Sequence, residues 1–380
     1  MEQVVDTVII GGGPAGIASA IRLQKSGVSN LVLEKKTFPR EKTCAGMMTE
    51  KTVKMLAKLL DLEVDDLPKE LFCSVNDTVE LYHRQTMLTR STVAKPFRQV
   101  KRMDFDNFMA TQYKDLGGNL MENTCCASLD LPGNKMTLSN GDTIAFQHLI
   151  VADGALSNVR ELLGYQKPKL GFCVETHIPK EKLPGCDVER IYFGIVPKGY
   201  TWVFPAGKEI CIGLGGVYQK GTPYEQLLKD FLTALGVDAK KCTLKGAFMP
   251  FGSPVKQTRG PDNAILIGDA GGFIDPITGE GLYFALVSGM VAADVILNDP
   301  KKIRPAFLKQ IEPFARTIRQ GNWLQGFFYS ASVQKMFVKM IAGKNGFVRF
   351  YSDNQLSEYG YSYAQMMKLC RDYKKGKKEK

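Results

Sequence analysis

The hydrophobic pattern of the chain begins with a continuous apolar run. Val4 to Ile10 is rich in β-branched residues, which predicts a strand buried on both faces. After a glycine-rich turn, apolar residues recur at helical spacing from Ile17 to Ser26, and Gly27 ends the pattern. Leu31 to Leu33 is a second apolar run. Strand, helix and strand in this order predict a β-α-β unit of a parallel sheet.

Further along the chain, the pattern changes to an alternation of apolar and polar residues. Residues 77–100 alternate in this way, which is typical of an antiparallel hairpin. More strands are expected between residues 171 and 250, including Ile191 to Val196 and Tyr200 to Phe204. The other predicted elements are a helix over 104–116, strands over 148–152 and 264–267, a helix over 281–297, and helices from 301 onward.

These elements predict an α/β protein. A Rossmann-like domain is interrupted by a mainly antiparallel β domain, and a helical region follows at the C-terminus. The predicted boundaries are 1–76, 101–170 and 260–300 for the first domain, 77–100 and 171–259 for the second, and 301–380 for the helical region.

The glycine-rich turn carries the first chemical motif. Gly11, Gly13 and Gly16 form G-x-G-x-x-G between the first predicted strand and helix. The first glycine permits a tight turn, the second lets the backbone approach a pyrophosphate, and the third permits close helix–strand packing. The helix N-terminus then faces the phosphates, and Glu34 at the end of the next strand can accept hydrogen bonds from a ribose. A purely structural glycine turn is the alternative.

Two further motifs follow predicted strands. One begins with Asp153-Gly154, and the other is the stretch Gly268-Asp269 to Pro276 that leads to Gly279-Glu280-Gly281 and a helix. The three motifs in this order resemble the p-hydroxybenzoate-hydroxylase-like FAD superfamily. The segments Phe38 to Gly46 and Pro197 to Pro205, followed by Cys211 to Gly215, are similar to segments of its geranylgeranyl reductase group. Ala45 departs from that group, which usually has glycine there.

This resemblance implies that the Rossmann-like domain binds FAD. Asp269 would contact the ribityl or pyrophosphate part, with a helix cap as the alternative role, and the helix from Gly281 would point its positive end at the flavin pyrimidine. Arg102 would contact the cofactor, and Cys126 would pass the adenosine. The full implied cofactor set is Gly11, Gly13, Pro14, Ala15, Gly16, Glu34, Lys35, Lys42, Cys44, Ala45, Arg102, Cys126, Asp153, Gly154, Asp269, Gly279, Gly281 and Leu282.

Cys44 is the candidate catalytic residue. The resemblance places it near the flavin, where it would help to deliver a proton or shape the substrate end of the site. A buried thiol that acts only as a small hydrophobe is the alternative.

Aromatic residues mark a candidate substrate wall. Tyr200, Trp202 and Phe204 share one face of a strand by period two, and Ile191, Phe193 and Ile195 would line a neighbouring strand. Such a wall suits a lipid-like substrate, although ordinary core packing gives the same pattern.

The charge of the chain is uneven. The 380 residues carry a net charge of +11, yet residues 301–380 hold 17 Lys+Arg and 5 Asp+Glu, a charge of +12. The body is therefore nearly neutral, which argues against a nucleic-acid groove. The terminal lysines of 374–380 are expected to give weak contact with an anionic membrane. A helical apolar stripe from Tyr329 to Ile341 either packs on the protein or meets a membrane or lipid chain.

Other features bear on location and cofactors. The nine cysteines include no C-x-x-C pair, so we expect them to be reduced. No targeting or membrane-spanning segment is visible, so we expect a cytoplasmic protein that is peripheral to a membrane at most. We also expect a monomer. The three histidines are far apart in the sequence, so no metal site is predicted. No second G-x-G-x-x-G opens a helix; an external donor, NAD(P)H or a ferredoxin-like protein, would reduce the flavin.

The resemblance implies an FAD-dependent reductase that passes a hydride from reduced flavin to a double bond of a prenyl or other apolar chain. A flavin monooxygenase, a flavin halogenase and a flavin-bearing membrane-surface protein without enzymatic activity are the alternatives.

Overall fold

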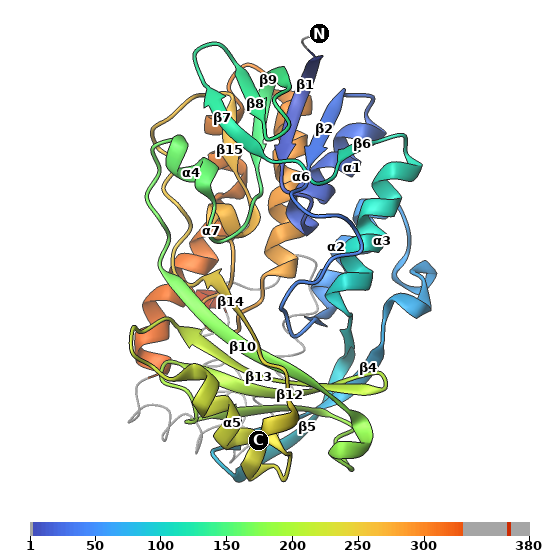
Figure 1. Cartoon of the computed structure of the whole chain (residues 1–380), viewed down its shortest axis with the longest axis vertical. Helices are drawn as coiled ribbons and strands as arrows, with labels where there is room; N and C mark the ends of the chain where they lie inside the picture. Colours follow the sequence, from blue (N-terminus) through green and yellow to red (C-terminus); the bar gives the residue numbers. More distant parts are fainter. Residues whose placement is uncertain (1–2, 330–362, 366–380) are drawn as a thin grey trace, which may run out of the picture.

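The structure is a computed structural model that describes residues 3–329 and 363–365. Two β-sheets follow one another along the long axis of the molecule. The first lies in the upper half of Figure 1 and the second in the lower half.

The first sheet is mainly parallel. Within the described residues its seven strands are β1 (Gln3–Ile10), β2 (Asn30–Leu33), β6 (Asn119–Met121), β7 (Cys126–Asp130), β8 (Lys135–Leu138), β9 (Thr143–Val151) and β15 (Ala264–Leu266). Their order is β6-β2-β1-β9-β8-β7, and β15 also pairs with β9. Because β1 has parallel neighbours on both sides, its Val8, Ile9 and Ile10 are buried, as the continuous apolar run predicted.

Helices cover one face of this sheet. The helices of the body are α1 (Pro14–Lys25), α2 (Glu50–Leu60), α3 (Arg102–Asp115), α4 (Asn158–Leu162), α6 (Leu282–Asn298) and α7 (Ile303–Phe328). A Cβ on Gly289 of α6 would lie 2.3 Å from the carbonyl oxygen of Ala15, so glycine is what lets the backbones of α1 and α6 touch. The opposite face of the sheet packs against Val159 of α4 and against Leu163 and Tyr165, which follow that helix.

The second sheet is antiparallel except for one pair of strands. Among the described residues it has eight strands: β3 (Met47–Met48), β4 (Ser74–His83), β5 (Thr86–Gln99), β10 (Leu170–Pro179), β11 (Glu189–Phe193), β12 (Gly199–Ala206), β13 (Glu209–Val217) and β14 (Lys245–Pro250). Their order is β14-β10-β13-β12-β11-β4-β5-β3, with β11 parallel to β4. Helix α5 (Tyr224–Ala234) covers the outer face through Leu228 and Leu232, so the inner face is turned toward the first sheet (Figure 1).

Short 3-10 helices lie at Val64–Asp66, Lys69–Leu71, Lys180–Lys182, Ala239–Lys241 and Gly268–Gly271. In the part of the chain that the structure describes, no helix is both long and apolar enough to cross a membrane.

The predicted fold class is confirmed, and the differences are local. Helix α1 begins at Pro14, three residues before the predicted start, because proline is compatible with the first turn of a helix. The strand predicted over Ile191 to Val196 ends at Phe193, because Gly194 has a φ of +80°. Ile195 therefore packs in the outer cluster and not beside Ile191, so its predicted place on the substrate wall is wrong.

The domain boundaries stay a prediction. The chain contributes β1 and β2 to the first sheet, β3 to β5 to the second, β6 to β9 to the first, β10 to β14 to the second, and β15 to the first. The apolar stripe beyond Tyr329 and the terminal lysines lie outside the described residues.

Candidate active site

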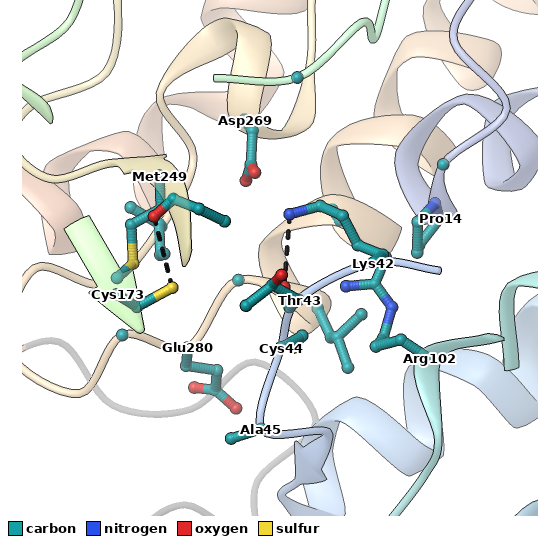
Figure 2. Close-up of a pocket in the computed structure, with 18 of the residues that line it drawn as sticks. Pro14, Lys42, Thr43, Cys44, Ala45, Arg102, Cys173, Met249, Asp269 and Glu280 are labelled. Atoms are coloured by element: carbon teal, nitrogen blue, oxygen red, sulfur yellow. Dashed lines mark hydrogen bonds between the residues drawn. The ribbon is translucent and has the colours of Figure 1, made fainter. Parts of the chain in front are cut away.

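A cavity of about 1060 Å³ lies between the two sheets. Its lining comes from the turn after β1, from the N-terminal ends of α1 and α6, from the segment 35–47, and from the inner face of the second sheet. Figure 2 shows Pro14 and Arg102 on one side of this space, Cys173 and Met249 on the opposite side, and Asp269 above the segment that carries Cys44.

The glycine motif divides into structural and open positions. A Cβ on Gly11, whose φ is +107°, would lie 2.3 Å from the carbonyl oxygen of Ala152, and a Cβ on Gly16 would lie 2.0 Å from the oxygen of Gly11. A Cβ on Gly13 would meet nothing closer than the Arg40 guanidinium at 3.9 Å. Gly11 and Gly16 are therefore required by the fold itself, whereas the surface of Gly13 is left open toward the cavity.

Glu34 braces this turn. Its Oε2 accepts a hydrogen bond from the Gly12 N–H at 3.0 Å and pairs with Arg40 at 3.3 Å, and its Oε1 accepts from the Lys36 N–H at 3.0 Å. Arg40 also pairs with Asp106 at 3.0 Å. Arg40 lines the cavity and was missed as a site residue, although it stands in the segment that carried the family resemblance.

The other two strand-end motifs lie beside this turn, because β9 is parallel to β1 and β15 is parallel to β9, so that all three strands end at the same edge of the first sheet. Oδ1 of Asp153 is a buried acceptor with no hydrogen-bond partner among the described residues, and burial raises the pKa of this carboxyl group. The buried Arg160 donates to the carbonyl oxygens of Ala155 and Ala270, at 3.0 and 3.2 Å. Arg160 thereby joins the Asp153 motif to the motif that holds Asp269.

Hydrogen bonds to two strands of the second sheet fix the Cys44 segment. The Cys44 N–H donates to Glu175 on β10 at 2.8 Å, and Gln99 on β5 donates to the carbonyl oxygen of Ala45. Burial lowers the pKa of Arg102, but Asp106, at 2.8 and 2.9 Å, and the Cys44 side chain raise it by more, so the guanidinium stays charged.

The inner face of the second sheet forms an apolar wall. Tyr200, Trp202 and Phe204 follow one another along β12, with ring centroids 6.0 and 6.5 Å apart. Ile191 and Phe193 of β11 also line the cavity.

The loop between β15 and α6 is held by hydroxyl and amide groups from distant parts of the chain. Asp275 accepts the N–H groups of Ile277 and Thr278, each at 2.8 Å. The Tyr363 hydroxyl donates to both carboxylate oxygens of Asp275, at 2.8 and 2.7 Å, and the Tyr200 hydroxyl donates to the carbonyl oxygen of Thr278. Tyr363, which also lines the cavity, could not be predicted because its contact depends on the fold.

The fold also brings together a histidine and a cysteine that are distant in sequence. Glu175, His177 and Cys211 have ligand-type atoms within 4.8 Å of one another. Burial, followed by the nearby Glu175 carboxyl, raises the pKa of Cys211 well above its usual value, so it is a neutral thiol. Cys211 donates to Glu175 at 3.8 Å, whereas His177 lies 4.0 Å from Glu209, so among the described residues the three side chains are neighbours that do not share one hydrogen-bond network; the absence of a metal site stays a prediction.

Almost every predicted site residue lines this one cavity. They are Gly11, Gly13, Pro14, Ala15, Glu34, Lys35, Lys42, Cys44, Ala45, Arg102, Cys126, Asp153, Gly154, Tyr200, Trp202, Phe204, Asp269, Gly279, Gly281 and Leu282. Gly16 is the exception, because it packs against Gly11 behind the lining. The individual roles of these residues stay predictions.

The lining fits a dinucleotide cofactor. The open surface of Gly13 adjoins the N-terminus of α1, whose first-turn N–H groups have no partner within the helix and suit a pyrophosphate. The partnerless oxygen of Asp153 offers an acceptor to a hydroxyl-bearing group. The residues present therefore fit FAD.

Comparison with known proteins agrees with this fit. Residues 4–177 match the family model described as FAD binding domain. A protein of Methanosarcina barkeri is 30% identical over 334 residues, which cover 85% of this chain and 84% of the relative. The menaquinone reductase of Mycolicibacterium smegmatis is 27% identical over 324 residues, 78% of each chain. The digeranylgeranylglycerophospholipid reductase of Methanococcus vannielii is 26% identical over 333 residues, 82% of each chain.

A solved structure shares the whole fold. The geranylgeranyl bacteriochlorophyll reductase-like protein of Thermoplasma acidophilum superimposes with a TM-score of 0.78 at 19% identity, covering 98% of this chain and 100% of that one.

Proposed function

We propose a function that follows from family membership: this chain belongs to the geranylgeranyl reductase family of p-hydroxybenzoate-hydroxylase-like FAD-dependent oxidoreductases. In this proposal, the protein reduces carbon–carbon double bonds of a prenyl or other apolar lipid-like substrate. One observation carries the proposal. The open glycine turn and the apolar wall of the second sheet line the same cavity, so a cofactor and a long apolar chain would meet there.

The chain's own residues would bind and orient both molecules. Gly13 and the N-terminus of α1 would hold the pyrophosphate, and Glu34 and Asp269 would accept hydrogen bonds from the cofactor hydroxyls. The positive N-terminal end of α6, at Gly281, would favour negative charge on the cofactor. When bound in its reduced form, FAD would supply a hydride. The wall of Tyr200, Trp202 and Phe204 would orient the apolar chain and exclude water.

The proposal includes an external electron donor. NAD(P)H or a ferredoxin-like protein would reduce the flavin. Gly213 and Gly215 form a second G-x-G, but they lie within strand β13 and do not open a helix, which supports a donor that binds without a dedicated domain.

The decisive test uses the purified full-length protein with FAD bound. The flavin is reduced under anaerobic conditions and mixed with polyprenyl lipids or a cell lipid extract. We expect reoxidation of the flavin, with products heavier by one H₂ for each double bond reduced. No reoxidation by any prenyl lipid would refute the proposal.

The alternatives give different results in the same experiment. A monooxygenase requires oxygen and gives a hydroxylated product, and a halogenase requires a halide. A flavin-bearing binding protein would turn over no acceptor but would bind vesicles differently in its two redox states. Family membership favours an enzyme over this last alternative.

We further propose a cytoplasmic monomer that contacts anionic membranes weakly. In the described part of α7, Trp323 is 79% exposed and lies near Arg316 and Arg319, a combination that suits a lipid headgroup region. Each lysine of 374–380 would add at most about 1 kcal/mol near an anionic surface. Deletion of 374–380 should weaken flotation with anionic vesicles and leave FAD content unchanged; unchanged flotation would refute this part of the proposal.

A further inference from the structure

One carboxyl group stands on the apolar wall. The strands of the second sheet contribute two charged residues to the cavity lining, Lys95 and Glu175, among the residues that the structure describes. Lys95 is exposed to solvent, whereas Glu175 is only 4% exposed. Glu175 follows Cys173 on the inner face of β10, and Trp202 and Cys44 line the cavity with it.

The hydrogen bonds of Glu175 suit both of its protonation states. Its Oε1 accepts the Cys44 N–H at 2.8 Å, and its Oε2 lies 3.8 Å from the Cys211 thiol. The indole N–H of Trp202 also donates to that sulfur, at 3.4 Å. When Glu175 is ionised, Cys211 can donate to it; when Glu175 is protonated, its O–H can donate to the sulfur. A group that must lose and regain a proton needs partners of this kind.

The charged neighbours of Glu175 do not pair with it directly. The titratable and charged groups around it are Lys42 and Cys44 of the preceding segment, Arg102 of α3, Cys173 and His177 of β10, Cys211 of β13, and Lys245 of β14. Lys245 pairs with Glu41 at 2.7 Å and Arg102 with Asp106. Burial raises the pKa of Glu175; the Cys44 N–H, Lys42, Cys211 and Arg102 oppose this without reversing it. The neutral acid therefore persists to higher pH than for an exposed glutamate.

We infer that Glu175 is the proton donor of the reaction, a role that rests on the proposed double-bond reduction. In that reduction, one carbon of the double bond would receive a hydride, and thus both electrons, which FAD would supply when bound in its reduced form. The π electrons of the double bond then form a C–H bond at the other carbon with the proton of Glu175. The O–H bond of Glu175 breaks, a carboxylate remains, and it regains a proton from water.

The two tyrosine hydroxyl groups that line the cavity, among the residues that the structure describes, are already engaged. The Tyr200 hydroxyl donates to the carbonyl oxygen of Thr278, and the Tyr363 hydroxyl donates to Asp275. The Cys44 side chain interacts with Arg102. Cys44 stays a competing donor, and the experiment must separate it from Glu175.

The test compares Glu175→Gln with Glu189→Gln and Cys44→Ser in the full-length, FAD-bound protein. Glutamine keeps an acceptor for the Cys44 N–H but has no acidic proton. Glu189 is the matched control, because it is a buried carboxyl group of the same sheet, 1% exposed, that bonds Asn76 and does not line the cavity. Flavin content and the flavin spectrum of each variant show whether the site is intact, and Glu175→Asp provides a variant that keeps the acid.

Two measurements decide the inference. The first needs no turnover: an infrared pH titration of the oxidised protein should show a protonated-carboxyl band that E175Q removes, distinct from the band that E189Q removes. The second is anaerobic reoxidation of reduced enzyme by a prenyl lipid. E175Q should slow it by about 100-fold or more, the scale of general acid catalysis, while reduction by the donor stays unchanged. The wild-type rate should fall as the pH rises, and E175Q should lose this dependence; E189Q and C44S should keep it.

The outcomes are distinct. If the wild type is active and E175Q keeps the wild-type reoxidation rate and pH profile, Glu175 does not donate the proton. If C44S then loses both the rate and the pH dependence, Cys44 is the proton donor. If E175Q leaves the infrared titration unchanged, Glu175 is already ionised and the inference fails. If no prenyl lipid reoxidises even the wild type, the proposed reduction fails first, and proton delivery with it.

Discussion

A methyl group added at Gly13 should weaken FAD binding and leave folding almost unchanged, whereas a methyl group added at Gly16 should destabilise the fold. In Gly13→Ala, the new Cβ meets no protein atom within 3.9 Å, and the φ of −76° is open to alanine. Alanine is a poorer helix N-cap than glycine, but it also reduces the freedom of the unfolded chain, so the free energy of unfolding without FAD should change by less than about 1 kcal/mol.

The same methyl group would occupy the surface where a pyrophosphate approaches the backbone. Loss of one charge-assisted hydrogen bond costs roughly 1.5–3 kcal/mol. The dissociation constant for FAD should therefore rise by about 10- to 100-fold, since 1.4 kcal/mol corresponds to about a factor of 10.

Gly16→Ala should behave in the opposite way. Its Cβ would lie 2.0 Å from the carbonyl oxygen of Gly11, so the β1–α1 turn must shift before FAD is present. We expect a loss of about 2–3 kcal/mol in unfolding free energy. Gly326→Ala is the control, because its Cβ meets nothing within 4 Å and it lies on α7.

The assay has two parts. FAD is titrated into flavin-free, full-length protein and followed by quenching of flavin fluorescence, and urea unfolding of the same preparations gives their stability. If Gly13→Ala binds FAD as tightly as the wild type, the backbone at Gly13 does not contact the cofactor, and the assignment of this turn to the pyrophosphate is refuted.

Three other predictions concern the wall, the loop and a buried acid. Trp202→Ala removes an aromatic side chain from the wall, so KM for a long-chain substrate should rise about 10-fold with unchanged FAD content, and stability should fall by roughly 3 kcal/mol; an unchanged KM in steady-state kinetics would mean that the substrate lies elsewhere. Tyr363→Phe removes the hydroxyl that donates to Asp275, and should lower the unfolding free energy by about 2 kcal/mol and hasten FAD loss; wild-type values in urea unfolding and flavin release would contradict the assigned contact. Burial raises the pKa of Glu189 to about 7, so the folded state favours the protonated carboxyl group. The resulting contribution to the free energy of unfolding is fully present below the unfolded pKa of about 4.3 and is lost as the pH rises through about 7. In urea unfolding, Glu189→Gln should therefore lose less stability than the wild type between about pH 5 and about pH 8, by on the order of 3 kcal/mol, and parallel curves would disprove the shift.

Local sequence signals were sufficient for much of the fold and for identifying residues that line the cavity, although the roles of those residues stay predictions. The turn at Gly11 and the strand end at Glu34 are set by neighbouring residues, so their spacing could be read directly. The position of Ile195 could not, because a single glycine with positive φ ends its strand two residues before it.

The residues that were missed act across long distances in the chain. Glu175 of β10 meets Cys44 of the segment before β3, and Tyr363 meets Asp275 from beyond α7. Nothing in the sequence around Glu175 distinguishes it from an ordinary strand residue until the fold buries it beside the cavity. Contacts of this kind depend on which strands become neighbours, and a local pattern does not contain that information.

The order of strands in the first sheet has a consequence for synthesis on the ribosome. Strand β1 pairs with β9, which begins at Thr143, and β9 in turn pairs with β15, which begins at Ala264. Strand β2 emerges soon after β1 and can pair with one of its edges, but at roughly 5–20 residues per second the other edge of β1 waits several seconds for β9 to emerge. The hairpin of β4 and β5 can close much earlier because its two strands are adjacent in the chain. The nascent chain therefore carries an unpaired apolar edge through most of translation, and its yield in cells should depend on chaperones that cover this edge.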